Sequence, residues 1–321
     1  MKPAPFAAMF PRPDYAELVA RLERPTGPVD VILDTDTYNE IDDQFALAYL
    51  VRSEPQLRVK AITAAPFYRD PAVGVCRSRD AADGMEKSYD EILRVLDLLE
   101  RPDLRDRVYH GARTYLPSET QPVPSDAAAA MVRLSKDYDK TRPLYIVAIG
   151  AITNVASALL TDPTMVERCV VIWLGGHAHH WGDCTDFNVS QDIAAARVVF
   201  GCGVPLVQFP CLGVVSEFRF SRPELEYWFR GKNKLCDRLI DDTYDFARLK
   251  FDHEGWSKPL WDAATIVWLL QGDFLLERYA PSPIPQYDCS YAFDDSRHPI
   301  KYVYYVKKDA IIADLAEKLG R

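Results

Sequence analysis

Five carboxylic acids lie within ten positions of one short segment, VILDTDTYNEIDDQF at residues 31–45. In order, they are Asp34, Asp36, Glu40, Asp42 and Asp43. Carboxylates this close repel one another unless a proton or a cation lies between them. Asp42 and Asp43 could be explained as negative charges at a helix N-terminus, but that leaves Asp34 and Asp36 unexplained. The segment therefore indicates a site for a hard divalent cation with oxygen ligands.

Two other acidic motifs fit these letters poorly. A calcium EF-hand loop would need Asp or Asn at Tyr38 and Gly at Asn39, and a helix rather than a strand before it. The haloacid dehalogenase phosphatase motif also opens with an apolar run and D-x-D, but it usually has Thr or Val where this chain has Tyr38. It would also leave the Asp42–Asp43 pair without a role.

Acids that act together need a scaffold that holds them at one place. Short apolar runs typical of buried strands alternate here with helical patterns, which predicts a mostly parallel central sheet with helices on both faces. The expected strands are Val29–Leu33, Leu57–Ile62, Leu144–Ile149, Cys169–Leu174 and Val204–Phe209, and the expected helices include Ile41–Arg52, Ile152–Leu160 and Asp192–Phe200. In such sheets ligands bind beyond the carboxyl ends of the strands, which is where the acids follow the first strand.

Two segments show neither pattern. Pro66–Gly84 and the Pro- and Asp-rich stretch Tyr279–Pro299 are expected to be irregular, either as functional lids or as plain surface loops.

Composition narrows the range of ligands. The chain of 321 residues has a formal net charge of -9 and no Lys/Arg cluster, whereas a nucleic-acid-binding surface relies on a basic footprint. We therefore expect a small ligand or a cation and no nucleic acid. Seven Cys without CxxC spacing predict neither a disulfide framework nor a zinc site. No apolar run has transmembrane length and no signal peptide is recognisable, so we expect no membrane contact and a cytoplasmic location.

Four segments occur in an order that one family shares. They are DTDTYNEIDD (34–43), IVAIGAITNVASALL (146–160), IWLGGHAHHWGDCTDFNVSQDIAAA (172–196) and WDAATIVWLL (261–270). These resemble, in turn, the DxDxxxDD signature of the calcium-dependent nucleoside hydrolases, their G-x-L-T-N turn, their M-G-G segment leading to E-F-N, and their late metal-binding Asp. The first loop is longer here by two residues. The resemblance implies one Rossmann-like α/β nucleoside hydrolase domain over residues 1–321, with 1–28 as an N-terminal extension.

The resemblance also implies roles for individual residues. Calcium would be held by Asp36, Asp43, the backbone carbonyl of Ile149 and Asp262, with Asp36 also acting as the general base toward a calcium-bound water. Asp42 would bind the ribose hydroxyls, and Asp186 and Asn188 would contact the far side of the sugar. The expected enzyme is a nucleoside N-ribohydrolase of purine salvage that releases free base and ribose, assembled as a homodimer or homotetramer.

The chain departs from the family at two sugar- and base-contacting positions. Thr63-Ala64-Ala65-Pro66-Phe67 stands where the family has T-V-A-G-N, so the ribose-binding Asn is missing there. Asn39 could replace it or could be a surface turn residue. Trp261 stands where many relatives have a leaving-group His; it either stacks on the base, as in purine-specific members, or packs in the core.

The acid that would protonate the leaving base is not fixed by these motifs. His179 and His180 follow Gly175-Gly176 at a strand end, as does His177, and His253 lies in a later segment. Two rival functions stay open beside the hydrolase. One is a non-catalytic nucleoside- or sugar-binding protein, and the other is a hydrolase of another N- or O-glycoside.

Overall fold

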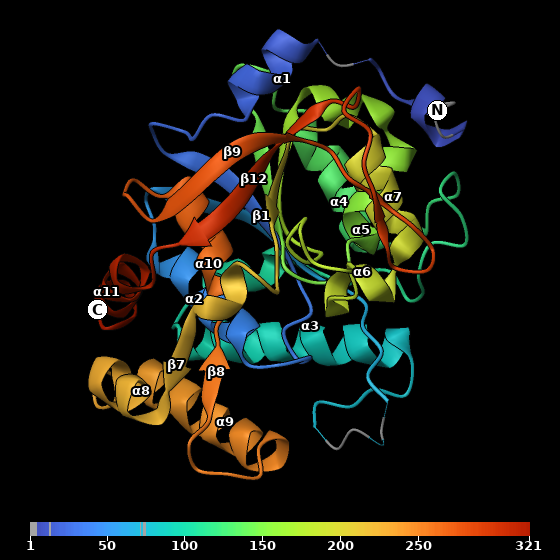
Figure 1. Ribbon diagram of the computed structural model, residues 1–321. Coiled ribbons are helices and arrows are strands. Elements are labelled where there is room, and N and C mark those ends of the chain that lie inside the picture. Colours follow the sequence, from blue (N-terminus) through green and yellow to red (C-terminus); the bar gives the residue numbers. More distant parts are fainter. Residues whose placement is uncertain (1–4, 13, 71, 73–74) are drawn as a thin grey trace.

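The computed structural model describes residues 5–12, 14–70, 72 and 75–321, and these form one eight-stranded sheet with helices on both faces (Figure 1). The strand order is β3-β2-β1-β4-β5-β6-β12-β9; every neighbouring pair is parallel except β12 and β9 at one edge. The strands are β1 Val29–Thr35, β2 Leu57–Ala64, β3 Val108–Tyr109, β4 Leu144–Ala148, β5 Cys169–Leu174, β6 Leu206–Phe209, β9 Leu275–Pro281 and β12 Pro299–Val306. The expected mostly parallel α/β sheet is confirmed.

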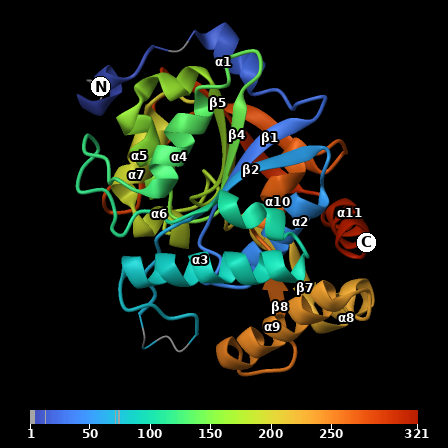
Figure 2. The ribbon, with the colours of Figure 1, turned by 180° about the vertical axis from the view of Figure 1, so that it is seen from behind.

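The helices cover the two faces of this sheet as separate layers. Figures 1 and 2 show α4, α5 and α7 on one side and α2, α10 and α11 on the other. The helices are α1 Tyr15–Arg21, α2 Asp42–Arg52, α3 Ala81–Leu98, α4 Asp126–Ser135, α5 Thr153–Thr161, α6 Phe187–Gln191, α7 Ile193–Gly201, α8 Arg222–Phe229, α9 Lys234–Lys250, α10 Ala263–Ile266 and α11 Lys308–Leu319. Short 3₁₀ turns are η1 Pro5–Met9, η3 Pro102–Arg107, η4 Pro163–Glu167, η5 Val215–Glu217 and η6 Val267–Leu269. In the described part of the chain, none of the helices is long and apolar enough to span a bilayer.

Strand β5 illustrates how the sequence builds the two cores. Successive side chains of a strand point to opposite faces of the sheet. Ile172 and Leu174 accordingly pack in the core under α2, whereas Val171 and Trp173 pack in the core under α5 and α7. A strand that is buried on both faces reads as a continuous apolar run, which is why this strand was predictable from its letters.

The described part of the N-terminal extension packs onto the domain. Phe6 and Phe10 pack in the core under α5 and α7. Leu18 and Leu22 pack in the core under α2. The boundary of this extension at residue 28 stays a prediction.

The two segments expected to be irregular contain more structure than predicted. Helix α3 already begins at Ala81, with the side chain of Asp80 accepting a hydrogen bond from the Asp83 amide at 2.8 Å. Edge strand β9 extends to Pro281, and the short pair β10 (Ile284–Pro285) and β11 (Tyr291–Ala292) follows it. An edge strand carries charged and exposed side chains, so its letters lack the apolar run of the central strands.

A small antiparallel pair lies apart from the main sheet and carries the last part of the site. Strands β7 (Arg219–Ser221) and β8 (Ser257–Pro259) pair so that Phe220 lies opposite Lys258, and Figure 1 shows them beside α8 and α9. The chain then passes directly into α10, which packs against α2. This turn brings the late segment around residue 261 to the carboxyl end of β1.

Candidate active site

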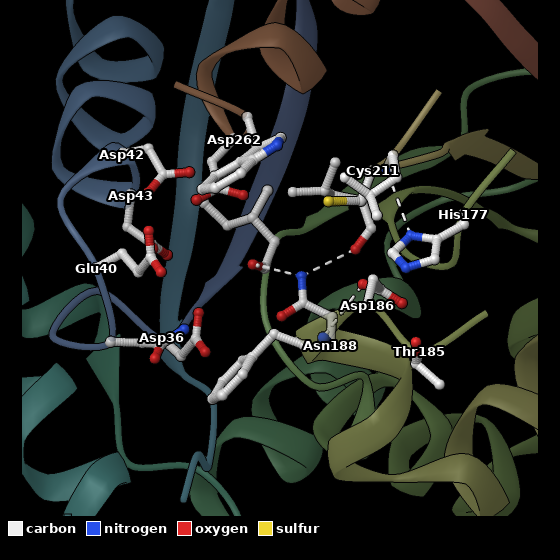
Figure 3. Close-up of a pocket in the computed structure, with 16 residues that line it drawn as sticks. Asp36, Glu40, Asp42, Asp43, His177, Thr185, Asp186, Asn188, Cys211 and Asp262 are labelled. Carbon is white, nitrogen blue, oxygen red and sulfur yellow. Dashed lines mark hydrogen bonds between the residues drawn. The ribbon is translucent and has the colours of Figure 1, made fainter. Parts of the chain in front are cut away.

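A cavity of about 370 Å³ opens at the carboxyl ends of the central strands, within the usual size range of small-molecule sites. Backbone bonds hold these ends together: the amide of Ile149 donates to the carbonyl of Asp34 at 2.8 Å, and that of Gly175 to Phe209 at 3.1 Å. Figure 3 shows the acids of the first loop with Asp262 on one side, and His177, Thr185 and Asp186 on the other. The lining residues are Asp36, Asn39, Glu40, Asp42, Asp43, Ile149, Leu174, His177, Thr185, Asp186, Phe187, Asn188, Cys211, Leu212, Trp261 and Asp262.

Four aspartates of this cavity form a buried acidic cluster. Asp42 and Asp43 begin α2, where the helix N-terminus favours negative charge. One carboxylate oxygen from each of Asp42, Asp43 and Asp262 lies within 4.8 Å of the other two. Asp36 lies outside that group of three, but it is close enough that the charges of Asp43 and Asp42, after burial, hold its pKa well above the usual value.

The cluster has the properties of a cation site. Both oxygens of Asp36 and one of Asp262 are buried and lack any hydrogen-bond partner, which is costly for a carboxylate. Burial and the charge of Asp42 raise the pKa of Asp43 to about 7, and burial with the charges of Asp42 and Asp43 holds that of Asp262 well above its usual range. Orphaned buried oxygens with mutual repulsion fit a hard divalent cation such as Ca²⁺. The precise ligand set of Asp36, Asp43, Asp262 and the Ile149 carbonyl stays a prediction.

Asp34 does not belong to this cluster, although it is one of the five acids that we expected to face the site. It is fully buried and absent from the cavity lining. One of its oxygens accepts hydrogen bonds from Thr63 Oγ1 at 2.6 Å and Asn154 Nδ2 at 2.9 Å. Asp34 lies within β1, whereas Asp36 follows the end of that strand, and the two residues differ in role. Asp34 ties β1 to Thr63 on β2 and to Asn154 on α5.

The sugar-side residues Asp186 and Asn188 line the cavity but are largely engaged with the backbone. Asp186 caps α6: its Oδ1 accepts from the amides of Gly176 at 2.7 Å and Val189 at 3.3 Å. Burial nevertheless raises its pKa to about 7. Asn188 Nδ2 donates to the carbonyls of Ile149 at 3.0 Å and Leu174 at 2.9 Å (Figure 3). The expected contacts of both residues with a sugar stay a prediction.

Asn39 also lines the cavity, and it is buried rather than placed in a surface turn. Its Oδ1 accepts a hydrogen bond from Arg69 Nε at 2.9 Å, so its NH₂ is the end that is left for a ligand.

Trp261 lies at the boundary between the cavity and the core, and its stacking on a base stays a prediction. It lines the cavity and packs partly against the core, and its indole Nε1 donates to Ser216 Oγ at 3.1 Å. The ammonium of Lys258 lies 4.1 Å from the centre of its ring. The ring is thereby held at the cavity wall by a hydrogen bond and a cation–π contact.

The structure does not bring the three expected leaving-group acids to the cavity. His179 packs among Tyr302, Tyr291 and Phe293 and bonds to Gln208, and burial lowers its pKa to about 4. His180 is exposed, and His253 lines a separate hollow near Trp256. Gly176, with φ of +77°, turns the chain after β5 so that His177 faces the cavity instead.

His177 is a hydrogen-bonding residue rather than a strong acid in this position. Its Nδ1 accepts from the amide of Leu212 at 3.3 Å, which assigns the proton of the neutral ring to Nε2. Burial lowers its pKa, although the charge of Asp183 opposes this shift. A neutral His177 can donate one hydrogen bond to a ligand.

The sequence motifs missed two cations next to the acids. Lys258 is buried in β8, with its ammonium 2.9 Å from Asp42 Oδ1, and Arg69 lies 3.2 Å from Glu40. A lone basic residue in a strand or loop carries no pattern that would identify it, so only their position reveals them.

Comparisons with known proteins agree with this geometry. The model of the inosine-uridine preferring nucleoside hydrolase family matches residues 31–298. The pyrimidine-specific ribonucleoside hydrolase RihA of Salmonella enteritidis PT4 is 28% identical over 265 residues, which cover 75% of this chain and 79% of the Salmonella protein. A plant nucleoside hydrolase structure, PpNRh1, superposes with a TM-score of 0.72 at 21% identity and covers 91% of this chain and 99% of its own. The structure of the type III effector XopQ, solved with adenosine diphosphate ribose, superposes with a TM-score of 0.62 at 16% identity. The superposition covers 99% of this chain and 98% of the XopQ chain. The two solved structures confirm the fold.

Proposed function

Because the chain belongs to the inosine-uridine preferring nucleoside hydrolase family, we propose that it hydrolyses the N-glycosidic bond of a ribonucleoside to free base and ribose. The observation that carries this proposal is the buried acidic cluster, in which oxygens of Asp36 and Asp262 have no partner although they face a cavity of ligand size. A binding site alone would not need several unneutralised carboxylates beside one another. A site that loads a cation and then stabilises positive charge on a sugar does need them.

Each residue of the cluster has a defined task in this reaction. Asp36, Asp43, Asp262 and the Ile149 carbonyl would hold Ca²⁺, which when bound would lower the pKa of a coordinated water and neutralise the carboxylates. Asp36 takes the proton of the attacking water. Asp42 accepts hydrogen bonds from the ribose hydroxyls. The remaining negative charge around the cavity stabilises the oxocarbenium-like transition state as the base departs.

Incubation with a panel of nucleosides, followed by chromatography for free base, tests the proposal directly. Release of base from at least one ribonucleoside in the presence of Ca²⁺ is the expected result. Tight nucleoside binding without any release of base would favour a non-catalytic binding protein. Cleavage of other glycosides but of no nucleoside would favour a hydrolase of another N- or O-glycoside. The expected homo-oligomer and cytoplasmic location stay predictions.

The base preference follows from Trp261. An indole face cannot donate a proton to a base nitrogen, but it stacks on flat heterocycles, with aromatic pairs contributing about 0.5–1.5 kcal/mol beyond burial. Purines offer the larger ring and can be protonated at N7, so we expect inosine or guanosine to be cleaved faster than uridine or cytidine. Trp261→Ala should narrow this preference, mainly through lost purine turnover.

Steady-state kinetics on inosine and uridine, with the variant and the unmodified protein side by side, measure this preference. Calcium binding should be unchanged by Trp261→Ala, which serves as the control for folding. Faster cleavage of uridine than inosine by the unmodified protein would rule out the stacking role and would match the pyrimidine specificity that the name of the Salmonella relative states.

A further inference from the structure

Lys258 contributes a fixed positive charge to the acidic cluster. Its side chain is buried, at 1% exposure, and its Nζ lies 2.9 Å from Asp42 Oδ1, 2.9 Å from Glu40 Oε2 and 2.8 Å from the carbonyl oxygen of Pro259. An ammonium has three donors, and here each has an acceptor. The ring of Trp261 covers it as well, so the charge has a single well-determined position.

The same ammonium connects segments that are far apart in the sequence. Glu40, which it contacts, belongs to the first loop that is longer by two residues, and the other oxygen of Glu40 contacts Arg69 Nη2 at 3.2 Å. Arg69 in turn donates to Asn39 and lies 4.9 Å from the ring centre of Phe187. The resulting chain of ion pairs and one hydrogen bond, Asp42–Lys258–Glu40–Arg69–Asn39, includes three residues that line the cavity, Asn39, Glu40 and Asp42.

This arrangement leaves one carboxylate of the cluster neutralised and the others not. Asp42 is compensated by Lys258, whereas Asp36 and Asp262 retain oxygens without partners. A positive charge beside the cluster also repels any cation that enters it.

We propose that Lys258 is a positioning residue, which holds Asp42 in place for the sugar hydroxyls and limits the affinity of the cluster for Ca²⁺. The part that concerns the sugar rests on the proposed function. The part that concerns the cation rests only on the cluster. The two parts predict opposite effects of one substitution, which a general loss of structure cannot produce.

Lys258→Met removes the charge and keeps most of the buried side-chain volume. Loss of one nearby positive charge is expected to tighten Ca²⁺ binding about 10-fold, because Asp42 and Glu40 then add to the negative potential. The KM for the preferred nucleoside should rise about 10-fold, because Asp42 no longer has a fixed orientation toward the sugar. The kcat should change much less, because Asp42 binds the sugar equally in the ground state and the transition state. Isothermal titration with Ca²⁺ and steady-state kinetics give the two values.

Lys301→Met is the matched control. Lys301 is also buried, at 5% exposure, pairs with Glu23 at 3.1 Å and lies 4.1 Å from the ring centre of Tyr279, but it is on β12 and does not line the cavity. Because Glu23 is largely exposed, Lys301→Met should lose less stability than Lys258→Met, and it should leave Ca²⁺ affinity and KM near those of the unmodified protein.

A double variant, Lys258→Met with Glu40→Gln, separates charge from position and, if the single variant folds poorly, restores the balance of charge between Asp42 and Arg69. It removes one charge of each sign, so Ca²⁺ affinity should return to within about 3-fold of the unmodified protein. The KM should stay raised, because Asp42 is still not held. Persistently tight calcium binding in the double variant would contradict the electrostatic explanation.

The results distinguish this inference from the proposed function. If the unmodified protein binds Ca²⁺ but releases no base from any nucleoside, the proposed function fails while the calcium titrations still test Lys258. If it hydrolyses nucleosides and Lys258→Met weakens or does not change calcium binding, or leaves KM unchanged, the role of Lys258 is overturned.

Discussion

Removal of calcium is expected to abolish nucleoside hydrolysis, and added Ca²⁺ is expected to restore it. Without a cation, Asp36, Asp43 and Asp262 are buried beside one another, Asp36 and Asp262 have oxygens without a partner, and the pKa of Asp43 is raised to about 7 by burial and by the charge of Asp42. A proton then replaces the cation, and a protonated carboxyl is neither a metal ligand nor a base. Activity after treatment with a chelator, and after titration of Ca²⁺ back into the same sample, measures the effect.

Thermal unfolding gives an independent measurement of the same site. A ligand that binds only the folded state adds about 2.7 kcal/mol of stability at 100 times its Kd, so Ca²⁺ should raise the Tm. Because the folded pKa of Asp43 is raised above its unfolded value, the metal-free protein loses stability as the pH rises from about 4 through about 7. The increase in Tm caused by Ca²⁺ should therefore be larger at pH 7.5 than at pH 5. Activity that survives the chelator, together with a Tm that does not respond to Ca²⁺, would refute the metal assignment.

Asp36→Asn is expected to lower turnover by about 10² or more, because the amide keeps an oxygen but cannot accept the proton of the attacking water. Substrate should still bind, since the proposed contacts of Asp42 with the sugar do not involve Asp36. A kcat that falls at nearly constant KM is therefore the expected pattern. Asp42→Ala should differ from it, with weaker binding of the sugar in both the ground state and the transition state.

Asp34→Asn is the matched control for this substitution. Asp34 lies two residues earlier and away from the cavity, and a single one of its oxygens accepts the hydrogen bonds from Thr63 and Asn154, which the oxygen of an amide can also do. Burial also raises the pKa of Asp34 to about 6, so an uncharged side chain is a modest change. The control variant should lose far less turnover than Asp36→Asn. Near-normal turnover in Asp36→Asn would mean that another group is the base.

The sequence by itself determined the class of fold and the place of the acidic site. Strands such as β5 are buried on both faces and therefore read as continuous apolar runs, and the acids of the first loop directly follow one of them. In a parallel sheet all strand ends of one kind meet at one edge, so local patterns suffice to predict that residues 36, 43 and 149 lie at the same edge. Asp262 follows the separate β7–β8 pair, and only the resemblance to the nucleoside hydrolases pointed to it. The edge strand β9 was not predicted, because its side chains are partly exposed and its sequence therefore lacks a continuous apolar run.

Only the tertiary structure decided which other side chains reach the site and in which direction they point. Lys258 and Asp42 are 216 positions apart, and their contact depends on how the β7–β8 pair packs beside α2. Likewise, three histidines follow β5, but the left-handed turn at Gly176 places only His177 in the cavity lining among the described residues. Side-chain direction and long-range ion pairs depend on packing between distant segments, and no local periodicity records that packing.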